Sequence, residues 1–110
     1  YTSSATLGKS TTSFTTDNQV SSPSGYSSGG KALVNVTPAL STDTAVCDFA
    51  DLSFVGVSLT ARGALIYNDT ASGDPAVAVL DFGGDKTATS GTFTIQFPTA
   101  NASAAILRIA

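Results

Sequence analysis

The stretch DFGGDK, residues 81–86, contains residue types that can do chemistry. An Asp-Phe-Gly triplet can hold a metal ion against a phosphate, but only beside a phosphate-covering glycine loop, a strand lysine and a catalytic loop. The sequence contains none of these three motifs. Asp81 and Asp85 could instead bind Ca²⁺ together with glycine carbonyls, although their spacing does not match a calcium loop. DFGGDK therefore predicts a loop that connects two strands, with a metal site as the alternative.

The composition removes most other catalytic chemistry. The 110 residues include no His, Met or Trp, and all eight acidic residues are aspartates. Cys47 is the single cysteine. A catalytic thiol needs a basic partner to lower its pKa, so we interpret Cys47 as a small buried apolar side chain. No spacing of the aspartates proposes a catalytic carboxylate pair. We therefore expect no enzyme activity, no cofactor and no bound metal.

Charge and hydropathy limit the partners. The formal net charge is -3 and only 12% of residues are charged. A nucleic-acid-binding protein gathers Lys and Arg on one face to neutralise phosphates, and five cations spread along the chain do not. No apolar run approaches the roughly 18 residues that cross a bilayer. The sequence therefore predicts neither nucleic acid nor membrane as a partner.

The first thirty residues predict an irregular arm on the surface of the domain. Half of them are Ser or Thr, whose hydroxyls compete for backbone hydrogen bonds and favour turns and extended chain over helix. We expect a short extended piece at 13–16, with Phe14, Val20 and Tyr26 anchoring the arm on the core. The predicted organisation is thus an arm at 1–30 and a β-domain at 31–110.

Strand-like runs recur through the rest of the chain, separated by Gly, Ser, Thr, Asn and Asp. In residues 92–97 apolar and polar side chains alternate, which is typical of a half-buried strand. Pro38 is expected to end the first run because it cannot donate a ladder hydrogen bond. Residues 99–109 are compatible with a helix, but their final alternation favours a strand. The seven predicted strands are 31–37, 45–49, 52–57, 61–68, 76–82, 92–97 and 104–109.

Seven short strands with polar turns predict an all-β fold. The spacing is typical of a single antiparallel β-sandwich or a flattened barrel of about seven short strands. The Ser/Thr-rich arm would lie outside this domain.

Arg62 is the most informative charged residue. It opens the otherwise apolar stretch ARGALIYND, residues 61–69, and it is the only cation between Lys31 and Lys86. A guanidinium at a sheet end can bond carbonyls or carboxylates, which would make it structural, or it can reach a partner. Gly63 beside it suggests a bulge or a close backbone contact. As candidate interface residues we name Tyr1, Phe14, Tyr26 and Arg62.

Three stretches together resemble the small virion structural proteins of tailed bacteriophages, especially those of marine and cyanobacterial hosts. In that family a GY-x-x-GG-x-x-L-x-N-V-T segment precedes an ARGA-x-IY strand and an FG-x-DK-x-x-x-x-GTF-T-x-x-F hairpin. Here these segments occupy residues 25–37, 61–67 and 82–97, and YTSSATLGK at 1–9 adds to the resemblance. It covers nearly the whole chain, and none of its motifs carries chemistry.

The resemblance implies a virion component that is not an enzyme. We expect a capsid decoration or cement protein that binds the major capsid protein or other virion proteins and associates with itself. An alternative is a self-assembling subunit of a tail, a fibre or an extracellular filament. A third interpretation is a host-surface or glycan-binding module, for which Tyr1, Tyr26 and Tyr67 would supply the aromatic platform.

Family members usually begin with a further segment that leads into the YTSSATL stretch. The chain starts at Tyr1 and contains no methionine, so we expect that translation did not begin at Tyr1. If a preceding strand has been removed, the exposed sheet edge would recruit a strand of another subunit.

Overall fold

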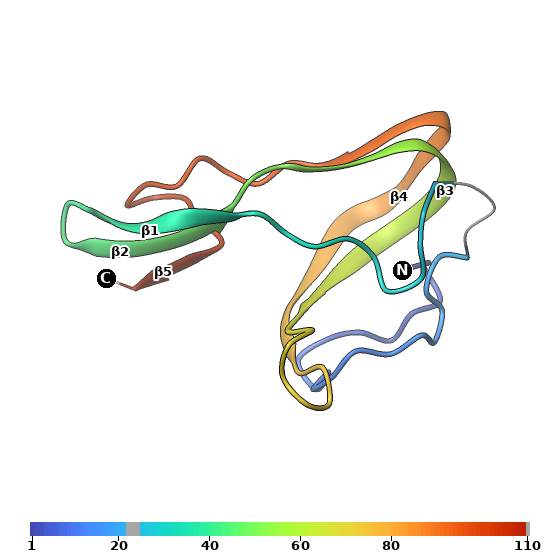
Figure 1. Cartoon of the computed structure of the whole chain (residues 1–110), viewed down its shortest axis with the longest axis horizontal. Coiled ribbons are helices and arrows are strands. Elements are labelled where there is room, and N and C mark those ends of the chain that lie inside the picture. The colour runs from blue at the N-terminus through green and yellow to red at the C-terminus, as the bar shows by residue number, and fades with distance from the viewer. Residues whose placement is uncertain (22–24, 110) are drawn as a thin grey trace. The chain divides into compact units, whose positions relative to one another are not determined.

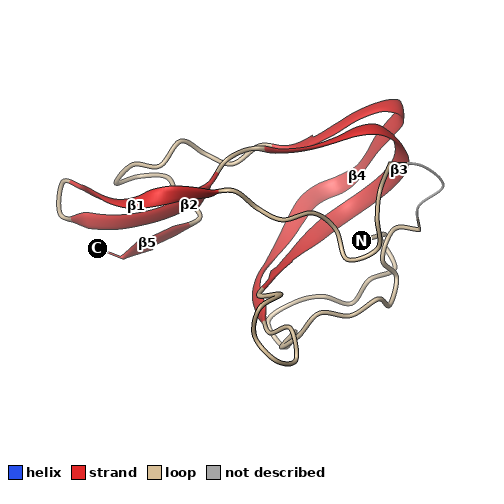
Figure 2. Cartoon of the chain, in the orientation of Figure 1, coloured by secondary structure: helices blue, strands red, loops and turns tan. Residues whose placement is uncertain are grey.

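The computed structural model describes residues 1–21 and 25–109, and in this part of the chain all regular structure is β (Figure 2). Two open antiparallel sheets form: a three-stranded sheet in the order β1-β2-β5, and the pair β3-β4 (Figure 1). The all-β prediction is confirmed. The described residues form five strands rather than the predicted seven, and their sheets are not closed. The strands are β1 Asn35–Ser41, β2 Thr44–Phe49, β3 Leu52–Tyr67, β4 Ala76–Ile95 and β5 Leu107–Ile109.

Four predicted runs merge into two long strands. Run 52–57 and most of run 61–68 lie in β3, which ends at Tyr67. Run 76–82 and residues 92–95 of run 92–97 lie in β4, which ends at Ile95. The polar and glycine residues between them are tolerated as irregularities because both strands keep a pairing partner. The predicted alternation at 92–97 is confirmed, since the three apolar side chains there are half-buried and the three polar ones exposed.

DFGGDK lies inside β4, so the prediction of a connecting loop is wrong. Two side-chain contacts between β3 and β4 show how many residues each strand has across this motif. Arg62 contacts Asp81, whereas Thr60 contacts Thr87. Between these contacts β3 advances 62 - 60 = 2 residues and β4 advances 87 - 81 = 6. The difference of four equals the difference between the 20 residues of β4 and the 16 of β3. DFGGDK is therefore a bulge in a paired strand, where Gly83 adopts a φ of 77°.

Pro38 does not end the first strand, contrary to expectation. β1 continues through it to Ser41, and its register against β2 shifts between Val36 and Ala39. Two conditions allow a proline here. β1 is an outer strand of its sheet, and the shift releases residues 37 and 38 from regular pairing.

The chain divides into two compact units. The first comprises Tyr1–Gly30 and Val55–Thr92, and the second comprises Lys31–Phe54 and Phe93–Ala110. The buried apolar side chains of the first unit include Val20, Val57, Ala61 and Ile66, with Val57 fully buried. In the second unit, Val46 and Leu52 are buried.

The Ser/Thr-rich segment flanks the hairpin of the first unit on both sides. Tyr1 exchanges backbone hydrogen bonds with residues 62 and 63 of β3. On the other side, Ser13 forms an antiparallel bridge with Pro75, just before β4. This bridge confirms extended backbone at the start of the predicted 13–16 piece. Of the three expected anchors, Val20 is buried, and Phe14 and Tyr26 are half-buried.

Thr42, in the turn between β1 and β2, has a strained backbone conformation. Ser41 pairs with Thr44, so Thr42 and Asp43 form a two-residue turn, and Thr42 has a φ of 56°. A β-branched residue is disfavoured there, whereas glycine adopts this φ freely. We expect Thr42→Gly to raise the free energy of unfolding by about 1 kcal/mol, measured by urea denaturation.

The matched control is Asp43→Gly. Asp43 is not among the residues with positive φ, so glycine there only adds freedom to the unfolded chain and lowers stability. Equal effects of the two substitutions would contradict the strain at Thr42.

Candidate functional site

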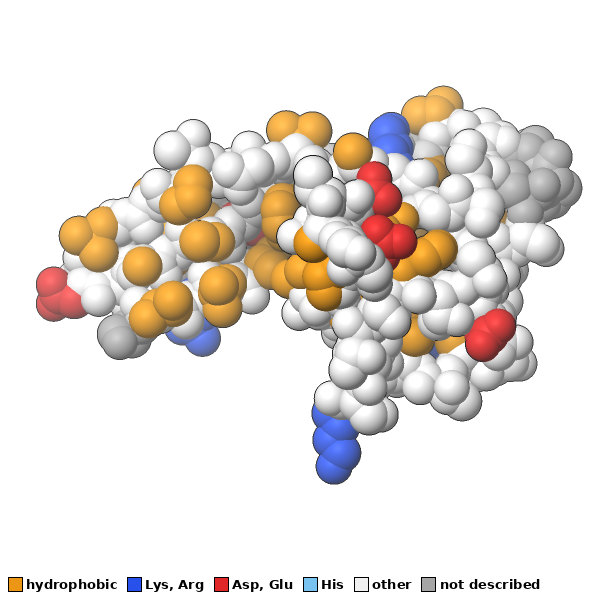
Figure 3. Space-filling model, turned by 60° about the horizontal axis from the view of Figure 1, so that its bottom comes forward, with side chains coloured by type: hydrophobic (Ala, Val, Ile, Leu, Met, Phe, Trp, Pro, Cys, Tyr) orange, Lys and Arg blue, Asp and Glu red, His pale blue; other side chains and the backbone are white. Residues whose placement is uncertain are grey.

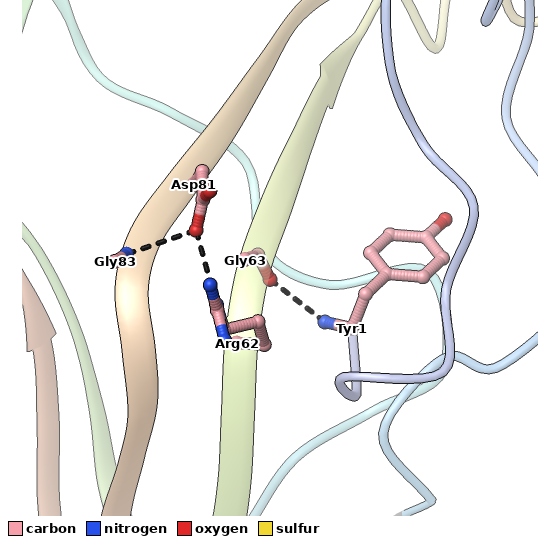
Figure 4. Close-up of polar contacts among 5 residues, drawn as sticks. All are labelled: Tyr1, Arg62, Gly63, Asp81 and Gly83. Carbon is pink, nitrogen blue, oxygen red and sulfur yellow. Dashed lines mark hydrogen bonds and ion pairs between the residues drawn. The ribbon is translucent and has the colours of Figure 1, made fainter.

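The ARGA and DFGG motifs meet across β3 and β4 (Figure 4). The Nε of Arg62 donates to Oδ1 of Asp81 at 3.2 Å, and the backbone N–H of Gly83 donates to the same oxygen at 2.9 Å. The two side chains are exposed, at 44% for Arg62 and 70% for Asp81. The guanidinium thus bonds a carboxylate at the start of the bulge, which is the structural role considered for it.

The Gly83 hydrogen bond, and after it the Arg62 contact, hold the pKa of Asp81 below its ordinary value. Both interactions favour the ionised carboxylate. Because the ion pair is exposed, it adds little to stability by itself. Its carboxylate also accepts the Gly83 N–H, so Asp81 links β3 to the first glycine of the bulge.

Tyr1 lies against the opposite edge of β3 (Figure 4). Its amino group donates to the Gly63 carbonyl at 2.8 Å, and its carbonyl accepts from the Arg62 N–H at 2.8 Å. Its phenol donates to the Thr15 carbonyl. Burial lowers the pKa of the amino group and raises the pKa of the phenol. One residue thus joins two parts of the Ser/Thr-rich segment to β3.

Three further contacts of aromatic side chains hold the same segment. Phe14 stacks on Tyr67, with ring centroids 4.6 Å apart and planes at 26°. The Tyr67 hydroxyl donates to the Gly29 carbonyl at 2.8 Å, and burial raises its pKa. The Tyr26 hydroxyl accepts from Nε2 of Gln19 at 2.8 Å. Sequence reasoning did not assign this role to Tyr67, although its position at the end of the apolar ALIY run, just before a turn, was a usable signal.

All four candidate interface residues lie in the first unit. Tyr1 contacts Arg62 through its backbone, while Phe14 and Tyr26 belong to the aromatic contacts. Arg62 alone among the four is exposed, and the three aromatic residues are half-buried. Their role in binding a partner stays a prediction.

Cys47 is half-exposed on β2, so its predicted burial is wrong. It shares the less buried face of β2 with Ala45 and Phe49, because side chains alternate along a strand.

Within residues 1–21 and 25–109, no three His, Cys, Asp or Glu side chains gather as metal ligands. Over the same residues, no helix is long and apolar enough to span a membrane.

Comparisons with known proteins identify no relative. No protein-family model matches the chain, and neither a curated protein nor a solved structure shows significant similarity to it.

Gly63 is in close contact with the β4 backbone, as the sequence suggested. A Cβ at this position would lie 2.5 Å from the Leu80 carbonyl oxygen. We expect Gly63→Ala to lower the free energy of unfolding by about 2 kcal/mol, because one strand must move. Gly84→Ala is the control, since a Cβ there has no atom within 4 Å. Equal losses of stability in the two variants, measured by urea denaturation, would contradict the contact.

The lowered pKa of Asp81 predicts a pH dependence of stability. A carboxyl whose folded-state pKa is depressed contributes stability above its ordinary pKa of 3.8, and this contribution is lost as the pH falls through the folded-state value. Asp81→Asn should therefore reduce stability slightly at neutral pH and flatten its decline below pH 3.8. Urea midpoints between pH 7 and pH 2 test this. An acid profile identical to that of the parent chain would contradict the contribution of Asp81.

Proposed function

We propose that this chain is a non-enzymatic structural protein of a tailed-bacteriophage virion, and that it acts as a capsid decoration or cement protein on the head lattice. Its partner is the major capsid protein or another protein of the shell. The proposal rests on the motif set at 25–37, 61–67 and 82–97, which resembles that virion family.

One observation supports a structural rather than a chemical role for these motifs. Their residues make the contacts that fold the first unit. Gly25, at a φ of 81°, approaches so closely that a Cβ would lie 2.8 Å from the Gly56 carbonyl oxygen. Gly29 accepts the Tyr67 hydrogen bond, and Arg62 bonds the carboxylate at the start of the bulge. Motif residues used in this way preserve a shape, and a preserved shape is what a repeating shell requires of its subunits.

The surface also suits binding to a lattice through many uncharged contacts. Few charged side chains occur on the face drawn in Figure 3. Exposed hydroxyl pairs lie between the strands, with Thr60 and Thr87 2.8 Å apart, and Ser53 and Thr94 2.9 Å apart. Hydroxyls both donate and accept hydrogen bonds and can therefore adapt to a partner without the desolvation cost of a charge.

Residues 1–21 are part of the folded first unit, which limits the experiments that can locate a capsid-binding surface. Their backbone is bonded to β3 and to Pro75 before β4, and Val20 is buried. Deleting this segment would therefore damage the first unit itself, so a loss of capsid binding would not identify the contact surface. Point substitutions on the surface of the folded unit give a sharper test, and Arg62 is the exposed candidate.

The location on the particle is tested with virions of the phage that encodes the chain. Heads are separated from tails, and both fractions are probed with an antibody against the purified protein. The expected result is many copies on heads. Labelling confined to tails or fibres would instead favour a self-assembling tail or fibre subunit, and absence from purified virions would overturn any virion role.

The contribution of Arg62 is tested by rebinding purified protein to heads that lack it. We expect Arg62→Ala to weaken binding at least ten-fold, or about 1.4 kcal/mol, because arginine in an interface makes several directed hydrogen bonds. Lys9→Ala removes an exposed cation from the same unit and should bind as the parent chain does. Circular dichroism checks that both variants are folded. Unchanged binding by Arg62→Ala would remove this residue from the interface.

A further inference from the structure

The three-stranded sheet of the second unit buries its more polar face. On β2, the side chains of Thr44, Val46 and Asp48 are buried, with only 9% of Thr44 and 4% of Asp48 exposed. The alternate side chains Ala45 and Cys47 are more exposed. A one-sided sheet in water normally buries its apolar face. Here the apolar face is the outer one.

The strand register extends this outer face across the sheet. Leu40 of β1 pairs with Ala45, which pairs with Ile109 of β5, and Cys47 pairs with Leu107. Directly paired residues project from the same face of a sheet. Leu40 is 74% exposed, Ile109 64% and Leu107 53%. The open face, as we call it, consists of Leu40, Ala45, Cys47, Leu107 and Ile109. Figure 3 shows apolar side chains gathered over this sheet.

The edges of the same sheet are poorly suited to adding another strand. β1 carries Pro38 and the register shift, so part of its outer edge lacks regular donors. β5 is three residues long, and its Arg108 bonds the Ala102 carbonyl of its own chain at 2.9 Å. Short strands, proline and charge are devices that block edge-to-edge pairing. Another chain would therefore contact this sheet through its open face rather than through its edges.

The chemistry of the open face fits a second copy of itself. A two-fold interface places the same patch on both subunits, so a charged patch would meet its own charge. The open face contains no charged residue. Three strands about 4.8 Å apart and up to about seven residues long present roughly 300 Å² per copy, against about 800 Å² per partner in a standard stable interface. The expected pairing is therefore weak and concentration-dependent.

We propose that two copies of this chain stack their open faces against each other, forming between chains the two-layered packing that the sequence predicts within one chain. Stacked sheets lie about 10 Å apart with interdigitating side chains. Leu40, Leu107 and Ile109 would be buried at this interface, with Cys47 near its centre. The inference does not rest on the virion role. On a shell, where neighbouring copies are held close, a weak contact of this kind gains from effective concentration.

The first test measures the mass of the purified full chain by sedimentation at concentrations from about 1 µM to 1 mM, a range that covers weak complexes. We expect the average mass to rise from monomer toward dimer. Ile109→Lys should weaken association at least ten-fold, because it places a charge in an apolar contact. Val77→Lys is a matched control, since Val77 is also 64% exposed but lies on β4 in the other unit. Its association should equal that of the parent.

The single thiol gives a second readout. Cys47 should react more slowly with a maleimide as protein concentration rises, and Ile109→Lys should remove this protection. Should Ile109→Lys prove unfolded by circular dichroism, Leu40→Lys places the charge on another strand of the same face. A mass that stays monomeric throughout, or association and Cys47 reactivity unchanged by the lysine variants, would overturn the proposal. Protection of Cys47 at the lowest concentration would also overturn it, since the chain would then cover its own open face.

Discussion

Pairing between two strands of unequal length is the constraint on which the first unit depends. β4 has 20 residues where β3 has 16, and their side-chain contacts place the four extra residues in DFGGDK. Extra residues can stay within a paired strand only if some backbone leaves the regular ladder. Gly83 supplies the positive φ, and the carboxylate of Asp81 fixes both Arg62 and the Gly83 N–H. The motif for which the sequence predicted a connecting loop thus accommodates the difference in length between the two strands.

The Ser/Thr-rich segment completes what two strands alone cannot stabilise. A two-stranded hairpin is marginal in water because it has little to bury against. Tyr1 bonds the free edge of β3, Ser13 bridges to Pro75 before β4, and the Phe14 ring stacks on Tyr67. Val20 adds one buried side chain. A segment with the composition of a flexible arm is therefore ordered by hydrogen bonds to strand edges.

The second unit presents the opposite situation. Its sheet buries Thr44 and Asp48 and leaves the open face toward solvent. Burying a carboxylate is unfavourable unless it is hydrogen-bonded, and Asp48 accepts the N–H of Phe49 at 2.8 Å. Leu40, Leu107 and Ile109 stay exposed to water, and the unfavourable exposure of their apolar side chains is not offset by a hydrogen bond. This asymmetry leads to the proposal that two chains meet at this sheet.

Composition and alternation by themselves determined the all-β class, most strand positions and the half-buried face of residues 92–97, because period-2 patterns are local properties. At Gly63 they left a bulge and a close backbone contact as alternatives. They did not determine that four runs form two strands, that DFGGDK is a bulge, that Pro38 lies within β1 or that Cys47 is half-exposed. Tertiary structure decided these features, because bulges, edges and faces depend on the register between residues distant in sequence, and register depends on which partner strand is present.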